Sequence, residues 1–260
     1  MTTLTESLRR PRPVFYLVMA GLFALIAFAG FTRTYLLPTL TNRFSGPAIL
    51  HVHAVLFFGW VILLAWQSGL VRQQRIEAHR AWGMVGISLA TAMVYTAMVL
   101  LVSALDFSVG AGTIERTRVL VVVPFSQILL FTAFVAAAVV AVSRPETHRR
   151  LMLLATANLL PAPTARLIGV VLGMRPNIGR PNIALVANEN LAFTAGLISA
   201  LAVDLLIVAA IVRDWRARGR PHSAYVVGGA CMLAVQLLRK PFAYTPLWHT
   251  ITDGLLALAR

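Results

Sequence analysis

Long apolar runs separated by short, arginine-containing loops dominate the pattern of hydrophobic and polar positions. Seven runs come close to the ~20 mostly apolar residues that an α-helix needs to cross a bilayer. They are residues 14–37, 48–71, 81–105, 119–142, 151–173, 191–212 and 224–238. The pattern predicts an all-α fold, a polytopic transmembrane helical bundle of about seven spans.

Proline and aromatic residues modify this picture in two places. Pro161 and Pro163 lie inside the fifth run, where each removes a backbone donor, so we expect a kink there. Residues 241–260 begin polar and then mix aromatic residues with leucines, a composition that favours an interfacial helix. The predicted organisation is a cytoplasmic N-terminal segment (1–13), a transmembrane helical domain (14–240) and an interfacial C-terminal tail (241–260).

Composition supports the membrane assignment. Of 260 residues, 58% are hydrophobic and only 12% are charged, against roughly 25% charged in soluble proteins. The net charge of +14 would suggest nucleic acid as a partner of a soluble protein. Here the arginines lie in short loops, so the charge indicates orientation in a lipid bilayer, with the N-terminus in the cytoplasm and no nucleic-acid partner. The excess of arginine over lysine favours a GC-rich bacterial source, and therefore the inner membrane.

Three histidines open predicted helices on the cytoplasmic side. They are His79, His148 and His222, and Arg80 and Arg149 adjoin two of them. Three imidazoles at one membrane depth predict a site for haem b or a transition metal, with the arginines on the haem propionates. The alternative is that these residues only anchor the helix ends at the interface.

A second set of possible metal ligands lies at the outer ends of the predicted spans. His51 and His53 open the second span, Glu189 precedes the sixth, and His249 lies in the tail. Imidazole with carboxylate suits zinc, copper or iron. Positions i and i+2 of a helix point about 200° apart, so we expect only one of the two neighbouring histidines to face such a site. Interfacial hydrogen bonding is the alternative.

Polar residues inside the spans predict an intramembrane pocket. Arg166 and Asp204 each cost roughly 2.5–3.5 kcal/mol to insert, so they are expected to face the bundle interior with Asn158. At ~1.5 Å per residue they differ in depth by about 11 Å. We therefore expect Arg166 to extend towards Glu189 or to cap an outer cavity, and Asp204 to find a donor such as Asn158 or Tyr95. The alternative is an interhelical hydrogen bond without a functional role.

Short segments resemble a known group of proteins. HAVLFFGWVILLAWQ, IEAHRAWG, THRRLM and RGRPHSAYVVGG resemble a broad group of uncharacterised bacterial multi-pass inner-membrane proteins with helix-opening His-Arg motifs. The HRRLM segment is also similar to multi-histidine membrane proteins linked to haem-copper oxidase maturation. This chain departs from those proteins because it has no histidine in mid-membrane, and from cytochrome b561 because it has no facing pairs of deep histidines.

No motif defines a reaction. The chain has no phosphate-binding glycine loop, no Ser-His-Asp arrangement, no HExxH and no CxxCH, so the sequence favours a protein that is not an enzyme. The leading hypothesis is a non-catalytic or accessory membrane protein with a polar pocket. The alternatives are a haem- or metal-binding redox protein that uses the histidines, and a small-solute transporter. A homo-oligomer or another membrane-complex partner stays open.

Overall fold

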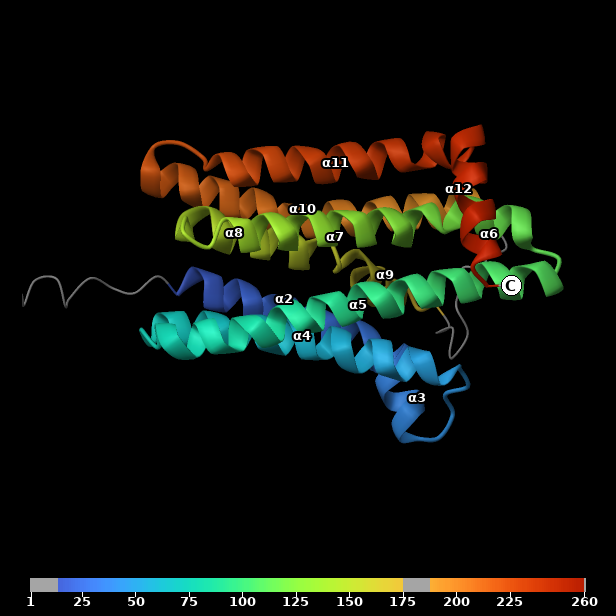
Figure 1. Cartoon of the computed structure of the whole chain (residues 1–260), viewed down its shortest axis with the longest axis horizontal. Coiled ribbons are helices and arrows are strands. Elements are labelled where there is room, and N and C mark those ends of the chain that lie inside the picture. The colour runs from blue at the N-terminus through green and yellow to red at the C-terminus, as the bar shows by residue number, and fades with distance from the viewer. Residues whose placement is uncertain (1–13, 175–187, 260) are drawn as a thin grey trace, which may run out of the picture.

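The computed structural model describes residues 14–174 and 188–259, and this part of the chain is helical without a β-strand (Figure 1). The elements, in order, are α2 (Phe15–Phe31), the π-helix η1 (Thr32–Leu36), α3 (Leu37–Leu40), α4 (Ala48–Arg72), α5 (Ile76–Gly110), α6 (Ile114–Leu120), α7 (Val122–Val140), α8 (Pro145–Ala157), α9 (Pro161–Val171), α10 (Glu189–Arg218), α11 (Ser223–Ala243) and α12 (Pro246–Ala257).

Among the described residues, six helices are long and apolar enough to cross a membrane, and the pair α8–α9 makes a seventh if its two halves form one span. The prediction of an all-α polytopic bundle is confirmed. Several helices extend beyond the apolar runs that predicted them. For example, α5 continues to Gly110, two residues before Gly112 adopts a positive φ of 67°, because no residue earlier in the run stops the helix.

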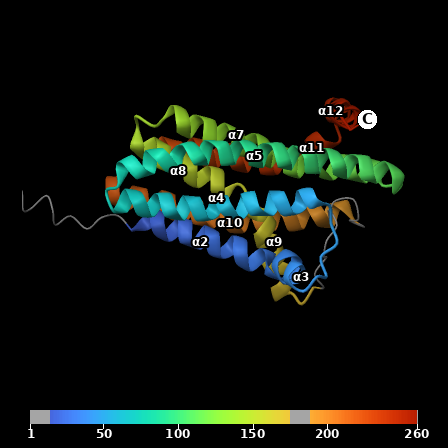
Figure 2. The same cartoon turned by 60° about the horizontal axis from the view of Figure 1, so that its bottom comes forward.

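The helices form two groups that run along the long axis of the molecule. In the first group, α2, α4 and α5 lie together; in the second, α7, α8, α10 and α11 do so (Figure 1). The turned view shows that α5 also lies alongside α7 of the second group (Figure 2). The short helix α9 packs against both α2 and α10 and so connects the groups. The start of α2 and the loops at 73–75, 141–144 and 219–222 share one end of the bundle, the basic end (Figure 1). Helices α3, α6 and α12 lie at the opposite end.

The predicted kink in the fifth span is confirmed, because α8 and α9 meet at 46°. Pro161 and Pro163 occupy the first turn of α9, where a missing N–H costs least. The break is held to α7 by two reciprocal bonds: Asn158 Nδ2 donates to Gln127 O (2.8 Å), and Gln127 Nε2 donates to Asn158 O (3.2 Å). Polar side chains therefore form hydrogen bonds with backbone groups beside a helix break at membrane depth.

Helix α9 can reach α2 only because residue 30 is glycine. A Cβ at Gly30 would overlap the backbone oxygen and Cβ of Pro163. One residue further on, Phe31 stacks edge-on against Phe57 and Phe58 of α4, with ring centroids 5.8 and 6.0 Å apart. This close contact brings the second half of the broken span against the aromatic core between α2 and α4.

The C-terminal helix α12 packs across the end of the bundle that is opposite the basic end. Trp248 is fully buried there and donates from Nε1 to Arg118 O at 2.7 Å, while Arg118 pairs with Asp253 at 2.5 Å. Thr245 caps the helix by accepting from Trp248 N. A helix thus forms within the predicted tail; its position at a membrane interface stays a prediction.

Candidate functional site

A cavity of about 310 Å³ lies where the broken span meets α2, α4, α5 and α7. Its wall is mostly apolar and aromatic, with contributions from Phe31, Phe44, Phe57, Phe58 and Phe131. The polar residues on the wall are Thr34, Tyr35, His53, Gln127 and Arg166. A mainly apolar hollow with a few polar groups, at the lower end of the usual size range, is typical of a small-molecule site.

Two departures from regular α-helix border this cavity. Thr34 and Tyr35 belong to the π-helix η1, which interrupts the first span. Leu159 lies in the break between α8 and α9, and Ala162 lies in the first turn of α9. Irregular backbone at membrane depth is tolerated where it is buried in protein or lines a cavity, and π-helical turns frequently occur at functional sites. Both irregularities thus mark the same place in the bundle.

Among the described residues that line the cavity, only Arg166 carries a permanent charge. Its Nη1 donates to Ala162 O one turn earlier in α9, at 2.8 Å, and its Cζ lies 4.6 Å from the ring centroid of Phe31. Its Nε is buried and has no hydrogen-bond partner among the described residues. Within that part of the chain, no carboxylate lies at ion-pairing distance from Arg166.

His53 offers a defined hydrogen-bonding group on the cavity wall. Its Nδ1 lies 3.1 Å from Thr96 Oγ1, whose hydroxyl donates to Met93 O at 3.1 Å. Because that hydroxyl has a single hydrogen, the histidine Nδ1–H must donate to Thr96. In the neutral ring Nε2 therefore keeps its lone pair and can accept a hydrogen bond.

The structure separates the residues that the sequence placed in one pocket. Arg166 lines the cavity, whereas Asn158 does not but bonds to Gln127, which does. Asp204 does not line it; Asp204 Oδ1 accepts from Gln236 Nε2 at 3.3 Å, between α10 and α11. Glu189 accepts from Tyr244 at 2.9 Å. The donor expected for Asp204 is thus a glutamine on the neighbouring helix, and the partner expected for Arg166 binds a tyrosine instead.

The histidines predicted at the outer face make separate contacts. His51 Nδ1 lies 2.9 Å from Tyr35 Oη, next to Phe44, whereas His53 faces Thr96. His249 lies on α12 and its ring has no contact with the other two. Among the described residues, no group of three or more His, Cys, Asp or Glu side chains is arranged to hold a metal ion.

Two of the three histidines predicted at the basic end do meet. The rings of His79 and His148 lie 6.3 Å apart, centroid to centroid, at 86°. His148 Nδ1–H donates to Ala138 O, and His79 Nδ1–H donates to Gln67 Oε1, both at 2.8 Å. Each neutral ring therefore keeps a free lone pair on Nε2. Arg80, which adjoins His79 in sequence, is exposed and makes no hydrogen bond to either ring within the described part of the chain.

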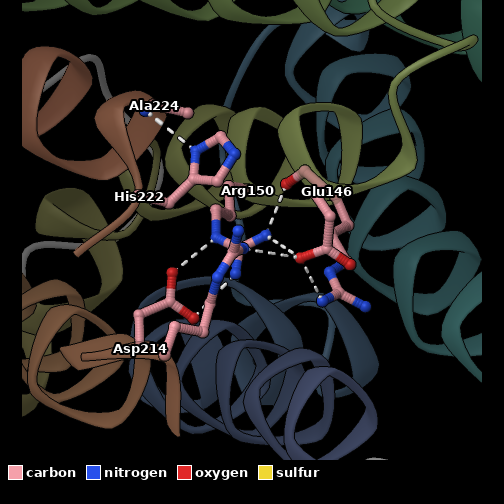
Figure 3. Close-up of polar contacts among 7 residues, drawn as sticks. Glu146, Arg150, Asp214, His222 and Ala224 are labelled. Atoms are coloured by element: carbon pink, nitrogen blue, oxygen red, sulfur yellow. Dashed lines mark hydrogen bonds and ion pairs between the residues drawn. The ribbon is translucent and has the colours of Figure 1, made fainter. Parts of the chain in front are cut away.

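An ionic cluster that the sequence did not reveal lies at the basic end (Figure 3). Arg150 is fully buried and forms a bidentate pair with Asp214 of α10, with both N–O distances 2.7 Å. Its Nη1 also donates to Glu146 Oε2 at 2.7 Å. The same carboxylate oxygen accepts from Arg149 at 2.6 Å and from Arg218 at 3.0 Å. Arg149, expected on a haem propionate, thus pairs with Glu146.

His222 borders this cluster and caps α11. Its Nδ1 accepts from the backbone N–H of Ala224 at 3.1 Å, so it is a helix cap and does not join His79 and His148 (Figure 3). Burial, followed by the charges of Arg150 and Arg218, lowers the pKa of His222, and the carboxylates of Asp214 and Glu146 oppose the shift. The neutral ring that the cap requires is thereby favoured.

The residues missed from the sequence share one property: their role depends on a partner far away in the chain. Arg150 and Asp214 lie in basic helix ends, where the positive charge is already explained by the orientation of the helices in the membrane. The signal that could have identified them was an acidic residue, Asp214, set among arginines at the same membrane depth. Gln127 gave the weaker signal of a polar residue within an apolar run.

Comparison with protein-family models, with curated proteins and with solved structures finds no match to this chain. The apolar helices fit a multi-pass integral membrane protein. Any more specific assignment depends on the chemistry of the cavity and of the clusters at the basic end.

Proposed function

We propose that this integral membrane protein is a non-catalytic, accessory protein that binds a small molecule in the cavity between α2, α4, α5, α7 and α9. The observation that carries the proposal is the guanidinium of Arg166 on the wall of a mainly apolar hollow, with no carboxylate partner and with Nε unbonded among the described residues. A charged group inside a membrane is costly to insert, and such a residue is a candidate for a functional site by default.

The helix irregularities support the same proposal. A π-helical turn and a broken span each weaken the regular backbone hydrogen bonding, which is costly in a membrane. Both border the cavity, where polar ligand groups could use the freed backbone. Membrane proteins that bind solutes often build their sites from such discontinuous helices.

The test is to fill the cavity and measure whether a bound molecule is lost. Native mass spectrometry of the protein released from mild detergent should detect a small-molecule adduct on the wild type. Ala97→Phe places a ring in the cavity from α5 and should abolish the adduct. Ala136→Phe, on an exposed face of α7, is the matched control and should retain it.

Two outcomes would count against the proposal. The wild type could carry no adduct after incubation with an extract of total membrane lipids and metabolites. Alternatively, Ala97→Phe could retain the adduct in full while its elution profile and thermal stability show a folded protein.

A transition-metal site at His79 and His148 is the second candidate, and the pairing of their rings favours it. Metal-bound histidines usually donate Nδ1–H to an oxygen acceptor and bind the metal through Nε2. Both of these rings donate Nδ1–H to an oxygen and have Nε2 available for a metal. Elemental analysis and a visible spectrum of protein purified with copper, zinc or haem precursor would test this. Stoichiometric metal that is lost in His79→Ala and His148→Ala would support it, and metal content unaffected by both variants would reject it.

A further inference from the structure

Within the described ranges, the wall of the cavity carries one permanent positive charge and no negative charge. A guanidinium stays protonated at any physiological pH, and none of the residues that line the cavity is Asp or Glu. Arg166 uses Nη1 on Ala162 O, and its Nε has no partner in the described ranges. Donor capacity is therefore left for a molecule that enters the cavity.

The start of α9 adds to the positive potential. Leu159 and Ala162, which flank the first residue of α9, both line the cavity. The N-terminus of a helix carries a partial positive charge that favours anions. Since Pro161 and Pro163 have no N–H, Ala162 carries the one backbone N–H among the first three residues of α9. The helix end and the guanidinium one turn later thus favour the same kind of ligand group.

The remainder of the wall favours an apolar ligand body. Phe31, Phe57, Phe58 and Phe131 enclose the cavity, and Met93 and Ile128 add aliphatic surface. A bare inorganic anion would pair with Arg166 and leave this surface without a partner. A neutral apolar molecule would fill the surface but leave the guanidinium uncompensated in a low-dielectric site.

We propose that the ligand of this cavity is an anionic amphiphile: one carboxylate or phosphate group that pairs with Arg166, attached to an apolar body that contacts the phenylalanines. This inference rests on the proposed function, because it names the chemical class of the molecule bound at the same site. Membranes supply this chemistry from two sources, free long-chain acids and the phosphate head groups of lipids.

The test compares probes that differ only in the head group. Isothermal titration of the protein in neutral phosphatidylcholine nanodiscs, corrected with empty discs, is carried out with decanoate, decyl phosphate, decanol and inorganic phosphate. We expect at least one of the two anionic probes to bind about tenfold or more tightly than decanol, the usual contribution of a charged hydrogen bond. Tighter binding of decanoate identifies a free acid as the source, and tighter binding of decyl phosphate identifies a lipid phosphate.

Arginine variants assign the effect to one residue. Arg166→Gln should lower the affinity for the preferred anion about tenfold or more and leave that for decanol unchanged, whereas Arg166→Lys should retain most of it. Arg213→Gln is the matched control: Arg213 lies 4.3 Å from the ring centroid of Phe15, so it makes the same kind of contact with α2 at the basic end. It should bind like the wild type.

The outcomes separate this inference from the proposed function. If decanol and both anions bind equally tightly and Ala97→Phe abolishes this binding, the preference for an anionic head group is overturned. The proposal that the cavity binds a small molecule would then stand. Inorganic phosphate that binds as tightly as decyl phosphate overturns the apolar body. Absence of binding by every probe, together with no native adduct, overturns both proposals. If Arg166→Gln does not fold, the affinities of the wild type for decanol and for the two anions test whether the ligand is anionic.

Discussion

At the scale of single residues, Arg150 is a fully buried charge that depends on two carboxylates. It is 1% exposed, and its charge is balanced by Asp214 on a different helix and by Glu146 one turn earlier in its own. Breaking a buried pair leaves an unpaired charge and costs far more than the pair itself contributes. The cluster therefore makes the contact between α8 and α10 intolerant of change.

We predict that Asp214→Ala lowers the free energy of unfolding by about 3–5 kcal/mol, because Arg150 then loses its bidentate partner. Unfolding in mixed micelles with increasing sodium dodecyl sulfate would measure it. Asp253→Ala is the control, since Asp253 is 58% exposed in its pair with Arg118, and should cost only about 0–1 kcal/mol. Equal losses in the two variants would contradict the prediction.

The cap formed by His222 predicts a dependence of stability on pH. Its pKa in the folded protein lies below the unfolded value, so the unfolded chain takes up the proton more readily. The stability from this group is present above the unfolded pKa of about 6.5 and is lost as the pH falls through it towards the folded value. Protonation also removes the acceptor for Ala224 N, a cap that contributes about 0.5–2 kcal/mol.

His222→Asn keeps a capping oxygen but cannot take up a proton in this range. The loss of unfolding free energy between pH 7 and pH 5 should therefore be smaller in this variant than in the wild type. The same change in both proteins would show that other groups control the acid response.

At the scale of elements, the cavity depends on how closely α9 approaches α2. We predict that Gly30→Ala costs about 1–3 kcal/mol, because its Cβ overlaps the backbone of Pro163 and must push α9 away. The same variant should weaken ligand binding, since Arg166 moves with α9. Denaturation and the titration described above would measure both effects.

Gly21 provides the control on the same helix. A Cβ there meets no atom within 4 Å, so Gly21→Ala should be neutral or gain up to about 1 kcal/mol from helix propensity. If Gly30→Ala behaved like Gly21→Ala, the close contact between α2 and α9 would not hold the cavity wall in place.

The sequence predicted the helices well and the cavity only in part, for physical reasons. A span is determined by the length of an apolar run, and the kink by Pro161 and Pro163, so both are local properties. The cavity joins Phe31, His53 and Arg166, whose meeting depends on how each helix is rotated about its axis. Arg166 could be identified alone because its charge is costly in a membrane, but Asp204 carries the same signal and bonds to Gln236 elsewhere.

At the scale of the whole molecule, the bent pair α8–α9 determines the topology. If the pair crosses the membrane as one span, seven crossings place the two chain ends on opposite sides. The distribution of arginines predicts that the N-terminus is inside. We predict that alkaline phosphatase fused after Arg260 is active and that green fluorescent protein fused there is dark.

Fusions after Gln74, in the loop between α4 and α5, should give the reverse pattern and serve as the control. Fluorescence at both positions would mean that α8–α9 enters and leaves on the same side. The α8–α9 residues that border the cavity would then belong to a re-entrant segment.

The position of the cavity residues along the chain also has a consequence for biogenesis. The described residues that line it run from Phe31 to Arg166, so all of them have been synthesised by the end of α9. The partner of Arg150 is Asp214, which is synthesised later, on α10. A nascent chain that ends after α9 therefore contains every described residue of the proposed ligand site but lacks Asp214, which pairs with Arg150.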